Sequence, residues 1–159
     1  MLYDTLIRNA LVIDGSNSPG YAADVAILDG RIARIGDLRD ANATDEIDAA
    51  GRVLAPGFID VHTHDDTVVI RQPQMLPKLS QGVTTVIVGN CGISASPVTL
   101  KGNPPDPMNL LGTAAAFVYP RFSDYRAAVE AANTTLNVAA LVGHTALRSN
   151  HLDLSLIHI

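Results

Sequence analysis

The residues with the clearest chemical potential are two histidines that stand two positions apart. His62 and His64 flank Thr63, and Asp60 precedes them at the same spacing. If this segment is a β-strand, residues i and i+2 point to the same face, so both imidazoles and the carboxylate share that face. The two imidazoles could then bind a divalent metal, with Asp60 as a hydrogen-bond acceptor that orients one ring. The alternative is a solvated histidine pair, because a His-x-His pattern alone is weakly specific.

The single cysteine of the chain is the second candidate ligand. Cys91 follows the apolar run 83–89 and lies 27 residues beyond His64. That separation is close to the length of one strand–crossover–strand unit, which would make the two strand ends neighbours and bring Cys91 to the histidines. A thiolate is a strong zinc ligand. The alternative is a buried, inert cysteine that serves only packing.

A third histidine and two aspartates complete the candidate residues. His144 ends the apolar run 136–143, so it is expected either to support the site or face the substrate, or else to be a structural histidine. Asp65 and Asp66 directly follow the histidine pair. We expect them to lie in a solvated loop or to cap a following helix.

Three apolar segments must position these residues. They are 58–64, which contains the histidine pair, and the runs 83–89 and 136–143, which precede the cysteine and the third histidine. The run 83–89 is rich in β-branched residues and apolar on both faces, and 136–143 is of the same kind, a pattern typical of parallel strands covered by helices. A helix is predicted over Asp124–Ala132 with Ser123 as its N-cap. Strands that alternate with crossovers predict an α/β fold, whose sites gather at the carboxyl ends of the strands. The proline-containing stretch 94–120 is expected to be a long loop.

The first 55 residues have a different pattern, typical of a small all-β module. Asp29-Gly30 separates two alternating apolar runs and predicts a hairpin that buries Val25, Ile27, Ile32 and Ile35. The predicted organisation is therefore a β module over residues 1–55 and an α/β unit over 56–150. Residues 151–159 end in an apolar tail without stop signals, and we expect this tail to be non-native or truncated.

Composition excludes several classes of function. The 159 residues are 47% hydrophobic and 17% charged, which favours a globular protein. The net charge of −5 argues against a nucleic-acid partner. The apolar runs fall short of the roughly 20 residues that a membrane span needs, and the N-terminus lacks a signal-peptide pattern, so no membrane partner and a cytoplasmic location are expected.

Two motifs resemble one known family closely. "LAPGFIDVHTHDD" followed by "GVTTVIVGNCG" is similar to the start of the metal-dependent amidohydrolase superfamily, and the cysteine of "GNCG" and "LVGHTALR" resemble its D-aminoacylase branch, the N-acyl-D-amino-acid deacylases. The resemblance implies a β-sandwich followed by a (β/α)8 TIM-type barrel. A barrel of this kind needs about 250 residues, so the chain is expected to be an N-terminal fragment carrying the sandwich and the first three barrel strands.

The resemblance also implies roles for individual residues. His62 and His64 match ligands of a weaker, second metal position, and Cys91 matches the thiolate ligand of a tightly held Zn2+. The family completes the zinc site with two histidines from later strands, and an aspartate after the last strand is the general acid and base. No catalytic residue is therefore expected within this chain, and Asp60 and His144 remain candidates for supporting the site or contacting the substrate.

The activity implied for the intact protein is zinc-dependent hydrolysis of N-acyl-D-amino acids to a carboxylate and a free D-amino acid. One alternative is another amidohydrolase, such as a dihydroorotase-like cyclic amidase, although that chemistry usually uses a bridging lysine where this chain has Cys91. The other alternative is a catalytically inactive fragment. The acyl group, the preferred amino-acid side chain and the oligomeric state are left open.

Overall fold

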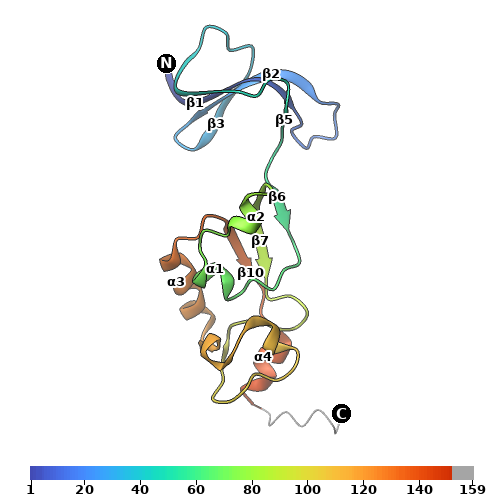
Figure 1. Ribbon diagram of the computed structural model, residues 1–159, viewed down its shortest axis with the longest axis vertical. Helices are drawn as coiled ribbons and strands as arrows, with labels where there is room; N and C mark the ends of the chain where they lie inside the picture. The colour runs from blue at the N-terminus through green and yellow to red at the C-terminus, as the bar shows by residue number, and fades with distance from the viewer. Residues whose placement is uncertain (152–159) are drawn as a thin grey trace. The chain divides into compact units, whose positions relative to one another are not determined.

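The computed structural model describes residues 1–151 and divides the chain into two compact units. The first unit runs from Met1 to Pro56, and the second begins at Gly57, where the sequence predicted a boundary after residue 55. Figure 1 traces both units along the chain. The tail predicted to be non-native or truncated lies outside the described residues, apart from His151.

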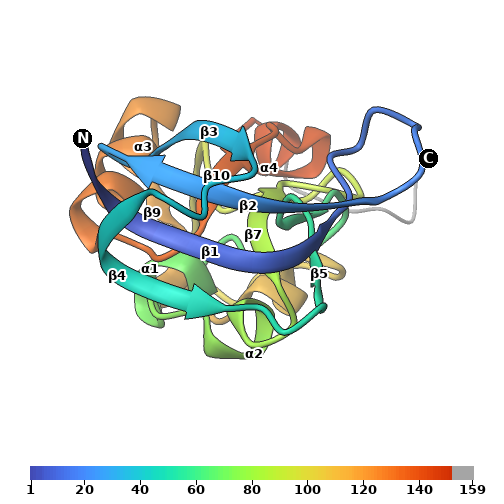
Figure 2. The ribbon, with the colours of Figure 1, turned by 90° about the horizontal axis from the view of Figure 1, so that it is seen from above.

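The first unit is built on one five-stranded β-sheet. Its strands are β1 (Leu2–Val12), β2 (Tyr21–Leu28), β3 (Arg31–Gly36), β4 (Asn42–Asp48) and β5 (Val53–Leu54). The strand order is β3-β2-β1-β4, with β5 paired to β1, and Figure 2 shows the four longer strands side by side. The predicted hairpin joins β2 to β3, and its turn residues Asp29 and Gly30 both have positive φ, 51° and 69°. These values are those of a type I′ turn, which matches the twist of the flanking strands.

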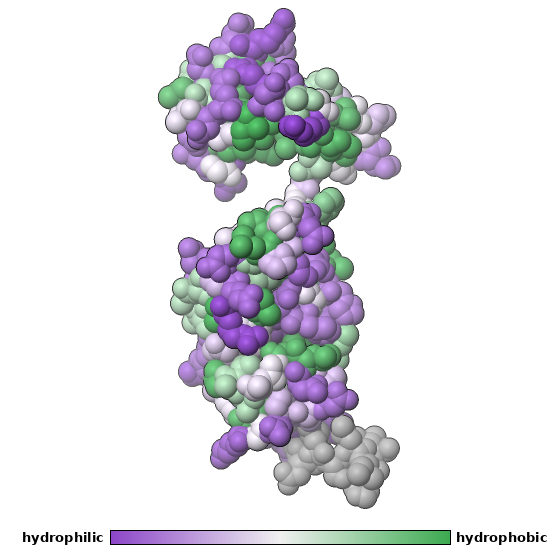
Figure 3. All heavy atoms as spheres, in the orientation of Figure 1, coloured by the Kyte–Doolittle hydropathy of each residue, from purple (hydrophilic) through white to green (hydrophobic). Residues whose placement is uncertain are grey.

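The two faces of this sheet are covered to different extents. One face carries a buried cluster that includes Leu6 and Leu38. On the other face Val25 is buried as predicted and Ile27 is half-buried, but Ile32 is 66% exposed and Ile35 is 40% exposed. The prediction that these two isoleucines are buried is therefore wrong, and Figure 3 shows apolar surface on this unit in green. Because the unit has one sheet, its described residues do not by themselves form the predicted two-layer sandwich.

The second unit contains a parallel sheet of three strands. They are β6 (Phe58–Asp60), β7 (Val83–Val88) and β10 (Asn137–Ala140), in the order β10-β7-β6. The three predicted strands are thus parallel neighbours, although each is shorter than its apolar segment. Parallel strands end at the same edge of their sheet, so the loops after β6, β7 and β10 share one edge. The described residues form an open sheet, and its closure into a barrel remains a prediction about a longer chain.

Helices and one short pair of antiparallel strands lie between and after these three strands in the chain. They are α1 (Val68–Arg71), α2 (Leu76–Leu79), the 3-10 helices η1 (Met108–Leu111) and η2 (Ala114–Ala116), the strands β8 (Val98–Thr99) and β9 (Val118–Tyr119), and the helices α3 (Phe122–Ala132) and α4 (His144–Ser149). The prediction of Ser123 as N-cap of α3 is wrong, because Arg121 holds that position. The Arg121 carbonyl already accepts the backbone N–H of Asp124, so helical bonding begins before Ser123.

Two buried clusters fix the second unit. Val69 of α1 packs with Val86 and Val88 of β7, and Val129 of α3 packs against the same cluster. A separate cluster joins Ile93, Met108, Phe117 and other apolar residues of the following segment to Ala146 of α4. The stretch predicted to be a long loop therefore has a core of its own.

Gly89 directly follows β7, and both its backbone conformation and its close surroundings allow only glycine. Its φ is +83°, and a Cβ built there would lie 2.2 Å from the carbonyl oxygen of Leu141. A left-handed conformation alone costs a non-glycine residue about 1–2 kcal/mol. We expect Gly89→Ala to lower the free energy of unfolding by more than about 2 kcal/mol in urea denaturation, because the backbone clash adds to that cost.

Gly82→Ala is the matched control for this prediction. Gly82 has nearly the same φ, +81°, but a Cβ there would meet only the Phe58 ring at 3.5 Å. The control should therefore show the conformational cost alone, and equal losses for the two variants would contradict the close approach at Gly89.

Candidate metal centre

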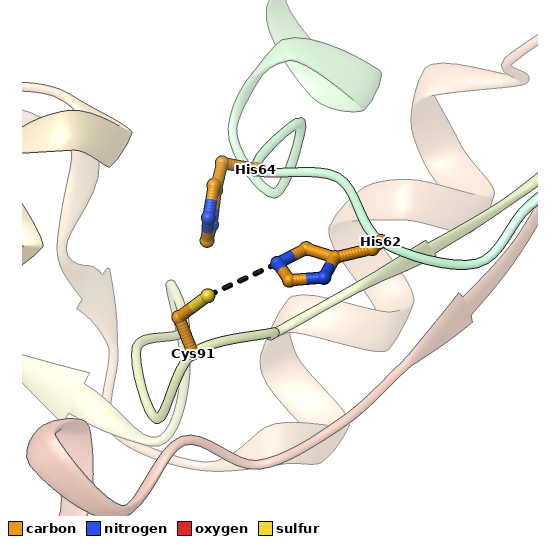
Figure 4. Close-up of side chains that lie close together, drawn as sticks. All are labelled: His62, His64 and Cys91. Atoms are coloured by element: carbon orange, nitrogen blue, oxygen red, sulfur yellow. Dashed lines mark hydrogen bonds between the residues drawn. The ribbon is translucent and has the colours of Figure 1, made fainter.

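Three side chains from two loops converge at the carboxyl edge of the parallel sheet. His62 and His64 follow β6 and Cys91 follows β7, and each offers one ligand atom such that all three atoms lie within 4.8 Å of one another. His62 Nε2 lies 3.0 Å from Cys91 Sγ, and the two imidazole centroids are 5.7 Å apart with the rings nearly perpendicular. Figure 4 shows the three side chains pointing toward a common space. The sequence-predicted ligands are thus brought together.

The donor set suits a soft or borderline divalent metal. One thiol and two imidazoles are the ligand types that zinc takes in proteins. His64 Nδ1 is buried and has no hydrogen-bond partner among the described residues. A buried polar atom of this kind normally has a partner, and a bound ion would supply the interaction that the imidazole lacks. The residues present therefore fit a metal ion.

The backbone that carries the two histidines is a loop, which corrects the prediction of a strand through residue 64. β6 ends at Asp60, and the Asp60 carboxylate accepts the backbone N–H of His62 at 3.3 Å. An aspartate that bonds to the backbone two residues on favours a turn over continued strand pairing. In a strand, Ile59 and Val61 would lie on the face opposite the histidines and pack against covering helices, but both are exposed. The imidazoles meet because of this turn, rather than because residues i and i+2 of a strand share a face.

Cys91 lies in a tight turn directly after β7. The cysteine itself has φ of 55°, between Gly89 and Gly92, which also have positive φ. The carbonyl of Asn90 accepts the backbone N–H of Ile93 at 3.0 Å, which closes the turn. Cys91 is a free, exposed cysteine, so it is not buried as the alternative interpretation requires.

Asp66 holds this turn in place, a role that sequence reasoning missed. Its side chain is only 1% exposed, and its two oxygens accept the backbone N–H groups of Gly89 at 3.3 Å and Ala95 at 3.2 Å. Burial raises the pKa of Asp66 above the usual range of an aspartate. The prediction of a solvated or helix-capping aspartate is therefore wrong for Asp66. Nothing in the sequence distinguishes it from Asp65 beside it.

Asp60 and His144 lie outside the cluster of three ligands. The Asp60 carboxylate pairs with the ammonium of Lys78, and this hydrogen bond is the main reason that the pKa of Asp60 lies below its usual range. Asp60 also accepts the backbone N–H of His62, and no bond to an imidazole ring is present among the described residues. His144 begins α4, and its side chain is exposed. Its proposed role in supporting the site or contacting the substrate remains a prediction.

The second unit is an α/β structure, and its parallel strands bring a thiol and two imidazoles to one edge of the sheet. That edge is a candidate metal centre. Comparison with known proteins identifies the family. The chain belongs to the amidohydrolase family, whose model matches residues 45–156 and so includes all three candidate ligands.

Comparison with individual relatives shows to which members of the family the chain is similar. D-aminoacylase of Alcaligenes xylosoxydans xylosoxydans is 49% identical over 147 residues, which are 92% of this chain and 30% of that protein. A solved D-aminoacylase, described as having a binuclear metal centre, matches with a TM-score of 0.91 and 48% identity over 95% of this chain and 32% of that one. N-acyl-D-glutamate deacylase of Bordetella bronchiseptica, solved with zinc and a phosphonate inhibitor, matches with a TM-score of 0.89 and 44% identity over 96% of this chain and 32% of that one.

These comparisons confirm the predicted resemblance to the D-aminoacylase branch. The chain spans about 30% of the length of the curated relatives it matches. Among residues 1–151, no helix combines the length and the apolar character needed to cross a membrane.

Proposed function

We propose that this chain is part of a zinc-dependent hydrolase that cleaves the amide bond of N-acyl-D-amino acids. The products would be a carboxylate and a free D-amino acid. The observation that carries this proposal is the cluster of His62, His64 and Cys91 in a member of the amidohydrolase family. Similarity to D-aminoacylase and to a zinc-bound N-acyl-D-glutamate deacylase supports the choice of substrate class and of metal.

The candidate ligands would belong to two different metal positions. Cys91 would bind the tightly held zinc as a thiolate, and His62 and His64 would serve a weaker second position, as the family resemblance implies. Zinc held at such a site provides a nucleophile at neutral pH, because it lowers the pKa of bound water to about 7, and it polarises the amide carbonyl. The exposure of Cys91 and His62 leaves the ligand atoms open to a substrate.

The remaining catalytic groups would come from sequence beyond this chain. Two further histidines would complete the tight zinc site, and an aspartate would protonate the leaving amine as general acid. Relatives about three times as long support this expectation, since the chain covers only 30% of D-aminoacylase. We therefore expect the 159-residue chain by itself to be inactive.

Paired enantiomeric substrates test the proposal in the full-length protein that contains this chain. We expect hydrolysis of N-acetyl-D-amino acids, little turnover of the L-enantiomers, loss of activity on zinc chelation and recovery on adding zinc. Equal turnover of both enantiomers, or activity that survives removal of all bound metal, would refute the proposal. Hydrolysis of cyclic amides in place of linear ones would favour the cyclic amidase instead.

Replacing one histidine separates the two metal positions. Asparagine is a poor zinc ligand, so His64→Asn in the full-length protein should weaken the second zinc equivalent about 10-fold or more and spare the first. Asp106→Asn changes an exposed side chain outside the cluster and should leave both equivalents unchanged. Titration with zinc against a chelating dye measures both affinities. Loss of the first, tight equivalent in His64→Asn would show that the two positions are assigned the wrong way round.

A further inference from the structure

The ammonium group of Lys78 contacts three polar side chains that lie next to the two candidate histidine ligands in the sequence. Lys78 lies on α2 and pairs with the carboxylate of Asp60. It also donates to Thr63 Oγ1 at 3.2 Å and lies 3.2 Å from Asp65 Oδ2. An ammonium has three N–H donors, so these three acceptors match its full capacity.

The three acceptors alternate with the candidate ligands along the chain. Asp60 precedes His62, Thr63 separates the two histidines, and Asp65 follows His64. Thr63 Oγ1 also donates to Asp65 Oδ2 at 2.6 Å, and Asp60 accepts the backbone N–H of His62 at 3.3 Å. Three side chains of the segment 60–65 therefore contact the Lys78 ammonium, although Lys78 contacts neither imidazole.

The same contacts determine where two carboxylates lie. Carboxylate oxygens are good zinc ligands, and Asp60 and Asp65 lie within two residues of the histidines. Neither belongs to the cluster of ligand atoms that His62, His64 and Cys91 form. Each instead has an oxygen within ion-pair distance of the Lys78 ammonium, and the Asp60, Asp65 and Lys78 side chains are partly buried, with 27%, 20% and 26% of their surface exposed. Without the ammonium, two carboxylates that both lie beside Lys78 would share a partly buried region without a counter-charge.

We propose that Lys78 is a positioning residue of the metal centre, which fixes His62 and His64 through Asp60, Thr63 and Asp65 and keeps both carboxylates away from the ion. This inference rests on the proposed metal site. Groups beyond the ligands that orient them typically change metal affinity 10–100-fold when they are mutated. Lys78→Met keeps the aliphatic stem of the side chain and removes its charge and its three donors.

The test loads the 159-residue chain with one equivalent of Co2+ and records its absorption, together with zinc affinity from chelator competition. The two later histidines of the tight site lie beyond this chain, so one ion here would be held by Cys91 together with His62 and His64. In Lys78→Met we expect zinc to bind about 10–100-fold more weakly. The sulfur-to-cobalt band should persist, because Cys91 lies outside the Lys78 contacts, but the d–d bands should shift as a carboxylate enters the coordination. Lys78→Arg should recover part of the affinity. Lys101→Met, which changes the exposed second lysine, should match the wild type.

A triple variant covers the case in which Lys78→Met does not fold. Lys78→Met/Asp60→Asn/Asp65→Asn leaves no unpaired carboxylate in this region. It should still bind zinc at least about 10-fold more weakly than the wild type, while its d–d bands should keep the wild-type positions.

Three outcomes would overturn the inference, and one of them also concerns the metal site. Wild-type affinity and spectrum in Lys78→Met would exclude a positioning role, and so would wild-type affinity in the triple variant. A wild-type chain that binds Co2+ without a sulfur band would instead refute the proposed metal site, and the role of Lys78 with it.

Discussion

Replacing Cys91 by alanine is expected to abolish tight zinc binding and, in the full-length protein, deacylase activity. Cys91 is the only cysteine among these 159 residues, so no other thiol of this chain can take its place. The loss should exceed the roughly 100-fold that changes beyond the direct ligands cost. Alanine pays the same conformational cost as cysteine at the observed φ of 55°. The variant therefore tests the sulfur atom and leaves the backbone strain unchanged.

Zinc content after gel filtration, measured by mass spectrometry, checks this prediction. Asp106→Ala is the control, because Asp106 is exposed and lies outside the ligand cluster. Retention of one tightly bound zinc in Cys91→Ala, with full turnover, would contradict the assignment of Cys91 as a ligand.

Replacing Asp66 by alanine is expected to cause a large loss of stability in the second unit. The substitution removes the acceptor of two backbone N–H groups, those of Gly89 and Ala95. Each buried donor left without a partner costs about 1–3 kcal/mol, so the free energy of unfolding should fall by about 2–6 kcal/mol. Because both bonds hold the turn that carries Cys91, zinc affinity should fall as well.

Two further variants sharpen this prediction. Asp66→Asn keeps one acceptor oxygen and should lose about half as much stability as Asp66→Ala. Asp106→Ala removes an exposed carboxylate and should change the free energy of unfolding by less than about 0.5 kcal/mol. If Asp66→Ala unfolded at the same urea concentration as the wild type, Asp66 would not hold the turn.

The sequence is informative about the candidate site where strand order alone determines proximity. Three apolar segments with crossovers between them predict parallel neighbours, and the structure has the order β10-β7-β6. Parallel strands end at one edge, so residues that follow them by a few positions meet there regardless of exact strand length. This is why His62, His64 and Cys91 lie together even though β6 is shorter than predicted.

Other features depend on interactions that hydrophobic patterning does not encode. β6 ends at Asp60, whose carboxylate accepts the backbone N–H of His62. The periodicity of apolar residues does not predict such a bond. The buried role of Asp66 depends on N–H groups 23 and 29 residues away. Alternation around Asp29-Gly30 indicates that Ile32 shares an apolar face, but whether that face is covered depends on a second layer of structure.

X-ray absorption at the zinc edge of the chain loaded with one equivalent of zinc tests the central claim most directly. The two histidines that would complete the tight site lie beyond this chain, so a single zinc ion here would be held by Cys91 together with His62 and His64, whose ligand atoms lie within 4.8 Å of one another. The spectrum should then show one sulfur neighbour at about 2.3 Å and nitrogen neighbours at about 2.0–2.1 Å from the same ion. The sulfur contribution should disappear in Cys91→Ala. A zinc ion surrounded only by nitrogen and oxygen in the unaltered chain would contradict the account.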